Sequence, residues 1–175
     1  MEKLIITGGK KLGGEISVHG SKNAVLPIMA SALLIKGETV LHNVPNLSDV
    51  EASANILRRL GARVERKAST LIIDASSVTG NTIPEEMMRE MRSSIIFLGS
   101  LLSRCGEAWL CPPGGCDIGI RPIDLHISSL KKLGAQITEN GNCICCRAVK
   151  LRGAKVFLSF PSVGATENII LAAVC

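Results

Sequence analysis

The stretch Leu57-Arg-Arg-Leu-Gly-Ala-Arg-Val64 returns 73 residues later, with conservative changes, as Leu130-Lys-Lys-Leu-Gly-Ala-Gln-Ile137. A second pair of similar segments, residues 30–41 and 99–110, is spaced by 69 residues. The two spacings together predict a third copy, and residues 170–174 resemble 28–32 where that copy should begin. Self-similarity at a fixed period is typical of a repeated supersecondary unit. We therefore expect a unit of roughly seventy residues that occurs about two and a half times.

Each unit is predicted to run strand, helix, strand, helix, strand, strand, from hydrophobic periodicity and from the glycines that follow the helices. In the first unit the expected helices are 21–36 and 48–60, and the strands are 38–42, 62–65 and 71–74. In the second, the helices are 84–104 and 122–133, and the strands are 107–111, 135–139 and 143–147. Further strands are expected at 15–19 and 155–160. This alternation indicates a layered α/β fold with helices packed on mixed sheets.

The composition excludes several classes of protein. Hydrophobic residues make up 46% and charged residues 20% of the 175 positions, which is typical of a folded domain and not of a disordered chain. Aromatic residues are only 2%, so the core must be aliphatic, and a base-stacking surface for nucleic acid is not expected. The net charge of +5 comes from scattered lysines and arginines, which suits a small phosphorylated ligand.

No apolar run has the length of a signal peptide or a membrane span, so we expect a cytoplasmic protein without membrane contact. Its seven cysteines are then expected to be thiols. The cluster Cys143-Ile-Cys-Cys146 leaves open a metal-binding alternative, but no second ligand pair lies at a suitable spacing. We expect these cysteines to fill a strand as small apolar residues, with no metal bound.

The segment 111–122, rich in proline and glycine, is predicted to be a loop that carries Cys116. Arg121 and Pro122 follow it and begin the second helix of the second unit. A helix N-terminus beside an arginine attracts anions and lowers the pKa of a nearby thiol, whereas Asp117 acts in the opposite direction. From the residues alone, Cys116 is either a reactive thiolate or an inert surface thiol.

Three separated segments, 20–27, 113–126 and 160–168, resemble motifs of the UDP-N-acetylglucosamine 1-carboxyvinyltransferase family of enolpyruvyl transferases, in the same order. The resemblance implies two lobes, each an inside-out α/β barrel of three βαβαββ units, and a complete length more than twice that of this chain. Residues 21–175 would form an incomplete first lobe, with repeats at about 21–80 and 81–150 and the start of a third at 151–175. Residues 1–20 would be strands that pack with the missing C-terminal lobe. An end within the apolar helix 168–175 also leads us to expect a fragment.

The family transfers the enolpyruvyl group of phosphoenolpyruvate to the 3-hydroxyl of UDP-N-acetylglucosamine and releases phosphate, without metal or organic cofactor, as the first committed step of peptidoglycan synthesis. The resemblance implies that Lys22 contacts phosphoenolpyruvate, that Asn23 bonds the reacting sugar, and that Cys116 is a general acid and the thiol alkylated by fosfomycin. The substrate-binding residues implied in this way are Lys22, Asn23, Arg92, Arg121, Pro122, Ile123, Asp124, Leu125, Ser162, Val163 and Gly164. Because an aspartate and an arginine of the family's site belong to the other lobe, we expect the chain alone to be inactive.

Other interpretations stay open at this stage. Lys22 is alternatively a solvated helix-start lysine, and Arg92 a surface ion-pair partner. Phe160 stands where some family members have a lysine, so one charged contact is in doubt. The chain is alternatively a non-catalytic sugar-nucleotide-binding module, or a shikimate-pathway relative, although the Pro-Gly-Gly-Cys loop favours the first family.

Overall fold

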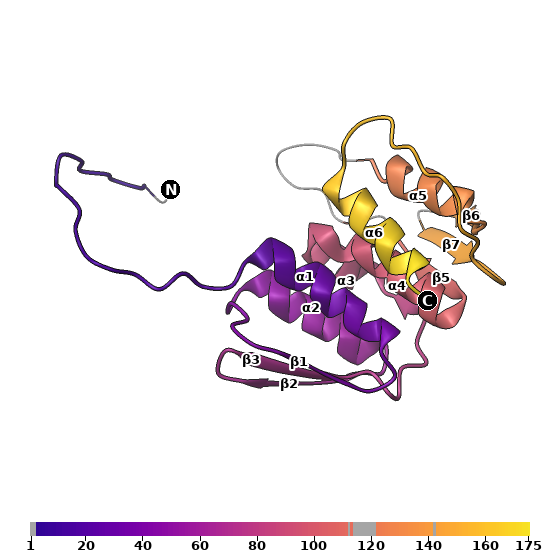
Figure 1. Ribbon diagram of the computed structural model, residues 1–175, viewed down its shortest axis with the longest axis horizontal. Helices are drawn as coiled ribbons and strands as arrows, with labels where there is room; N and C mark the ends of the chain where they lie inside the picture. Colours follow the sequence, from indigo (N-terminus) through magenta and orange to yellow (C-terminus); the bar gives the residue numbers. More distant parts are fainter. Residues whose placement is uncertain (1–2, 112, 114–121, 142) are drawn as a thin grey trace.

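The computed structural model describes residues 3–111, 113, 122–141 and 143–175, and it is shown in Figure 1. These residues form six α-helices, two short 3-10 helices and seven strands. Cys116 and Arg121 lie outside the described residues. The helices and strands divide into two units followed by a single helix; the second unit has the predicted order, and the first has it without the initial strand.

The first unit is a three-stranded antiparallel sheet covered by two helices. Its elements are α1 (Lys22–Ser31), η1 (Ala32–Leu34), β1 (Glu38–Leu41), α2 (Ser48–Arg59), β2 (Arg63–Lys67) and β3 (Thr70–Asp74). The strand order is β1-β3-β2, and Asp74 faces Glu38 on one side and Arg63 on the other. The central strand buries Leu71 and Ile73, the alternate positions that a pleated strand turns to one face. Figure 1 shows α1 and α2 together on one face of this sheet.

The second unit has a four-stranded mixed sheet of order β4-β5-β7-β6, in which only the β4–β5 pair of the described strands is parallel. Its elements are β4 (Thr82–Ile83), α3 (Glu85–Glu90), η2 (Arg92–Ile96), α4 (Phe97–Cys105), β5 (Glu107–Leu110), α5 (Asp124–Lys132), β6 (Gln136–Asn140) and β7 (Cys143–Arg147). The last helix, α6 (Val163–Ala173), packs against α4 and α5. The α/β class is therefore confirmed.

Three expectations about local structure are wrong. The helix expected at 84–104 is broken at Met91, whose backbone is extended (φ −141°, ψ 141°), and the hydroxyl of Ser94 donates to the Met88 carbonyl beside the break. The described residues form no strand at 15–19 or 155–160, because neither segment pairs with another strand; 15–19 is exposed, and 155–160 is exposed except at Val156 and Leu158, which are half-buried. The two-residue strand β4 was not anticipated, since it is too short to show an alternating pattern.

The core is aliphatic, as the composition predicts. Among the largest fully buried side chains only Phe97 is aromatic, and the others are leucines, isoleucines and methionines. They lie mainly on helices, and the buried residues of α1, α2, α4 and α6 belong to one continuous core. This shared core holds these helices in fixed positions relative to one another.

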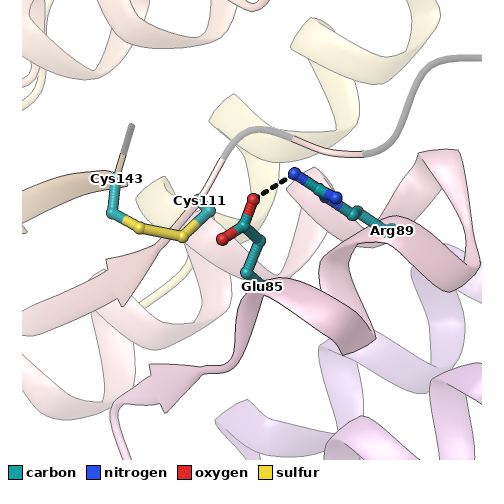
Figure 2. The surroundings of a disulfide bond; sticks show 4 residues. All are labelled: Glu85, Arg89, Cys111 and Cys143. Atoms are coloured by element: carbon teal, nitrogen blue, oxygen red, sulfur yellow. Dashed lines mark hydrogen bonds and ion pairs between the residues drawn. A yellow bond between two sulfur atoms is a disulfide. The ribbon is translucent and has the colours of Figure 1, made fainter. Parts of the chain in front are cut away.

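The expectation that every cysteine is a thiol is wrong, because Cys111 and Cys143 form a disulfide (Figure 2). β5 and β7 pair antiparallel, with Leu110 opposite Ile144. The next position of this register therefore brings Cys111, after Leu110, opposite Cys143, before Ile144. The pair Glu85 and Arg89 of α3 lies nearby in the same view. The described free thiols are Cys105, Cys145, Cys146 and Cys175.

Candidate functional site

The first turns of α1 and α2 are joined by an ion pair between Lys22 and Asp49. Lys22 Nζ lies 2.8 Å from Asp49 Oδ2, and the two side chains are 46% and 29% exposed. Gly20 precedes α1, where a Cβ would come within 2.0 Å of the Asn43 carbonyl oxygen. Only glycine allows so close an approach, so the start of α1 is held against the loop that follows β1.

Lys22 and Asn23 are the first two residues of α1, and both are exposed. The N–H groups in the first turn of a helix lack intrahelical partners and carry partial positive charge, which favours an anionic ligand. A partly exposed ion pair contributes little stability, so the Lys22 ammonium can exchange Asp49 for an anionic substrate at small cost. This geometry is compatible with the predicted phosphoenolpyruvate contact and also with a simple surface pair.

Arg92 begins η2, directly after the extended residue Met91, and is half-buried. The element η2 contacts both α1 and α6. The structure therefore places Arg92 on an element that packs against both α1, which begins with Lys22, and α6. Figure 1 shows α1, α4 and α6 running in the same direction, with their first turns toward the same end of the molecule.

The predicted segments 122–125 and 162–164 form the starts of two helices that contact each other, α5 and α6. Pro122 and Asp124 are exposed, whereas Ile123 and Leu125 are half-buried. Two adjacent helix starts present several free N–H groups, which is the arrangement that binds phosphate groups in many proteins. The structure thus places both segments at the starts of helices that contact each other.

At the start of α6, Ser162 is the N-cap, and its Oγ accepts a hydrogen bond from the Ala165 N–H at 3.3 Å. Val163 is 75% exposed. At Gly164 an added Cβ would meet the ring of His126 at 3.6 Å, which brings α5 close to the first turn of α6. Phe160, just before this turn, is exposed and supplies no charge.

Sequence reasoning missed three residues: Asp49 and His126, in the first turns of α2 and α5, and Asn168, in the second turn of α6. His126 is buried on α5, and its Nδ1 lies 2.9 Å from Asn168 Nδ2. Burial lowers the pKa of His126, so the neutral imidazole is favoured. The spacing of 42 residues between the partners gives no local signal in the sequence.

The cysteine cluster of β7 is unsuited to metal binding. Cys143 is in the disulfide, and burial raises the pKa of Cys146 to about 12, so this side chain is held as a neutral thiol. Metals bind the thiolate form. Searching the described ranges finds no group of three or more histidine, cysteine, aspartate or glutamate side chains that could hold a metal ion. The same ranges contain no helix long and apolar enough to cross a membrane.

Comparison with known proteins assigns this geometry to a family. The model of the EPSP synthase (3-phosphoshikimate 1-carboxyvinyltransferase) family matches residues 6–175. The chain is 49% identical over 173 residues to UDP-N-acetylglucosamine 1-carboxyvinyltransferase 2 of Caldanaerobacter subterraneus subsp. tengcongensis, covering 99% of the chain and 42% of that relative. It is 51% identical over 176 residues to UDP-N-acetylglucosamine 1-carboxyvinyltransferase of Chloroherpeton thalassium, with 99% and 41% coverage. The chain thus spans about two fifths of the length of these curated relatives.

Solved structures support the fold. The enolpyruvyl transferase NikO from Streptomyces tendae superposes with a TM-score of 0.78 at 19% identity, over 94% of this chain and 39% of that one. EPSP synthase from Acinetobacter baumannii superposes with a TM-score of 0.70 at 20% identity, over 91% and 38%. The fold and the match over residues 6–175 agree: the chain belongs to the EPSP synthase (3-phosphoshikimate 1-carboxyvinyltransferase) family.

Proposed function

We propose that this chain is the substrate-gathering part of an enzyme that transfers the enolpyruvyl group of phosphoenolpyruvate to the 3-hydroxyl of UDP-N-acetylglucosamine and releases phosphate. The proposal is carried by the adjoining starts of α5 and α6, with Lys22 on α1 and Arg92 on η2, the element that contacts both α1 and α6. Both substrates are anionic, and helix N-termini with cationic side chains are suited to them. The names of the relatives supply the substrate class.

Within this function we assign roles by position. Lys22 and Asn23, exposed at the start of α1, bind phosphoenolpyruvate and the reacting sugar hydroxyl. The segments 122–125 and 162–164, together with Arg92 and Arg121, hold the sugar nucleotide. Cys116 delivers a proton to the enolpyruvyl methylene as general acid. A metal or an organic cofactor has no role in this scheme.

We further propose that catalysis needs a second lobe. The chain spans about two fifths of the length of its relatives, and residues 21–175 would correspond to two and a half units of one lobe. Residues 3–19 are exposed along their whole length, with Leu4, Ile6 and Leu12 more than 80% exposed, as expected of a segment that packs elsewhere. The activity belongs in the cytoplasm, in the first committed step of peptidoglycan synthesis.

The first experiment measures phosphate release from phosphoenolpyruvate, with and without UDP-N-acetylglucosamine, for the purified chain and for the chain joined to a second lobe from a relative. We expect sugar-dependent release only from the joined protein, and its loss in Lys22→Gln. The variant Lys67→Gln is a matched control, because Lys67 also pairs with a carboxylate, Glu65, but lies on strand β2 and not at a helix start. Release by the chain alone would refute the need for a second lobe.

Binding measurements separate the enzyme from the alternative, a non-catalytic sugar-nucleotide-binding module. Calorimetric titration of the chain with UDP-N-acetylglucosamine should give weaker binding for Arg92→Gln than for Arg63→Gln, an exposed arginine of β2. If the sugar nucleotide binds, but the joined protein releases no phosphate, the module interpretation is correct.

Mass spectrometry after fosfomycin treatment tests the role of Cys116. We expect one fosfomycin adduct on the protein, and its absence in Cys116→Ala.

A further inference from the structure

The side chain of Asn168 is fully buried and makes three hydrogen bonds between different elements. Its Nδ2 lies 3.0 Å from the Ile95 carbonyl oxygen of η2 and 2.9 Å from His126 Nδ1 of α5. Its Oδ1 accepts from the Gly99 N–H of α4. One amide on α6 therefore links η2, α4 and α5.

The two backbone partners fix which way the amide points. A carbonyl oxygen can only accept and a backbone N–H can only donate, so the NH₂ group must face Ile95 and the oxygen must face Gly99. The NH₂ group then donates to His126 Nδ1, which must be unprotonated. A neutral His126 accordingly carries its single proton on Nε2.

The edge of the ring that carries Nε2 faces the start of α6. A Cβ added at Gly164 would lie 3.6 Å from Cε1 and 3.8 Å from Nε2 of His126. Gly164 belongs to one of the two segments that we propose for the sugar nucleotide, and His126 directly follows the other. The N–H donor of the ring thus lies at the junction between these segments.

Close packing leaves the amide little freedom to turn. A Cβ at Gly99 would come within 2.2 Å of the Asn168 carbonyl oxygen and 2.5 Å of its Oδ1. The absence of a side chain at Gly99 is what allows α6 to approach α4 so closely. The orientation of the amide is therefore set by backbone atoms on both sides.

We propose that Asn168 is a positioning residue, which fixes His126 as the Nε2–H tautomer at the junction of residues 122–125 and 162–164, so that the sugar nucleotide meets a hydrogen-bond donor there. The part of this inference that concerns the ligand rests on the proposed function. The tautomer itself does not. Asn168 acts only through His126 and the two helix starts.

The test is a long-range ¹H–¹⁵N spectrum of the histidine-labelled chain at neutral pH, which distinguishes protonated from bare ring nitrogens. We expect His126 to show one form, with the proton on Nε2. In Asn168→Asp a carboxylate oxygen replaces the NH₂ group and requires a donor, so the proton should move to Nδ1. His42, whose Nδ1 lies 3.2 Å from Thr70 Oγ1 on the first sheet, is the internal control and should not change.

A proton on Nδ1 in the wild-type chain, or an unchanged spectrum in Asn168→Asp, would overturn the assignment. If Asn168→Asp does not fold, Asn168→Thr takes its place, because threonine is smaller and removes the amide. Its His126 populations should shift toward the tautomer mixture of His19, which lies in the exposed segment 3–19. Populations identical to the wild type would again overturn the role of Asn168.

Titration with UDP-N-acetylglucosamine separates this inference from the proposed function. Perturbation of the His126 Nε2 signal, with at least tenfold weaker binding in Asn168→Asp, supports both. The expected tautomer with no binding to the wild-type chain overturns the sugar-nucleotide site but leaves the tautomer assignment standing. Binding of equal strength in both proteins overturns the positioning role while the proposed function stands.

Discussion

Lys22 Nζ lies 2.8 Å from Asp49 Oδ2, and this pair joins the first turns of α1 and α2 at the edge of the candidate site. Since both groups are partly exposed, the pair contributes at most about 1 kcal/mol to folding. Its importance in the proposed function lies in where it holds the ammonium group, not in stability. The two partners should therefore respond differently to substitution.

We predict that Lys22→Gln weakens phosphoenolpyruvate binding by at least tenfold in the joined two-lobe protein, because a charge-assisted hydrogen bond is lost. Asp49→Asn keeps the ammonium group and should weaken binding less. The free energy of unfolding of both variants should lie within about 1 kcal/mol of the wild-type value. Ligand titration and urea unfolding provide the two measurements, and equal loss of binding in both variants would contradict the assigned role of Lys22.

Gly99→Ala should destabilise the chain by roughly 2 kcal/mol or more, because a Cβ there overlaps Asn168 backbone and side-chain oxygens at 2.2 and 2.5 Å. Gly37→Ala is the matched control, since nothing lies within 4 Å of a Cβ at that position. The free energy of unfolding in urea measures both. A cost at Gly99 no larger than at Gly37 would mean that α4 and α6 are not packed as described.

The disulfide predicts a thiol count. Of the seven cysteines in the sequence, Cys111 and Cys143 are joined, so at most five should react with a thiol reagent under denaturing, non-reducing conditions. Reduction should expose all seven and lower stability by about 2–4 kcal/mol. A reducing cytoplasm would favour the thiol forms of Cys111 and Cys143. Seven reactive thiols in an air-oxidised sample would contradict the disulfide.

His126 predicts how stability changes with pH. Burial lowers the pKa of His126 in the folded chain below its usual value near 6.5, so the unfolded chain binds this proton more tightly. The His126 contribution is therefore fully present above about pH 6.5 and is lost as the pH falls below that value. The variant His126→Asn keeps an acceptor for Asn168 and should show a smaller loss of stability between pH 7 and pH 5. His42→Gln, at an exposed histidine, should retain the wild-type slope.

The secondary structure was largely predictable because its signals are local. The apolar periodicity and the glycines Gly61, Gly106 and Gly134, all with positive φ, mark where helices end. The repeated sequence at 57–64 and 130–137 gave the same helix-to-strand transition twice, and the structure has it twice. The helix break at Met91 was not predictable, since no proline or glycine interrupts residues 85–98.

The candidate site was predictable only in part. Lys22, Asn23, Arg92 and the segments 122–125 and 162–164 were found by resemblance, and the structure places them at helix starts on connected elements. Asp49 was missed because its partner is 27 residues away. Cys116 and Arg121 lie outside the described residues, so their assignment still rests on the sequence.

The sequence by itself determined the repeat, most of the order of helices and strands and the aliphatic core, because these depend on interactions between residues close along the chain. Tertiary structure alone decided that Cys111 meets Cys143 across two strands, and that Asn168 bonds groups 42, 69 and 73 residues away. Such contacts leave no periodic signal. They depend on how the elements pack. Buried polar groups need hydrogen-bond partners, and packing decides which groups lie close enough to pair.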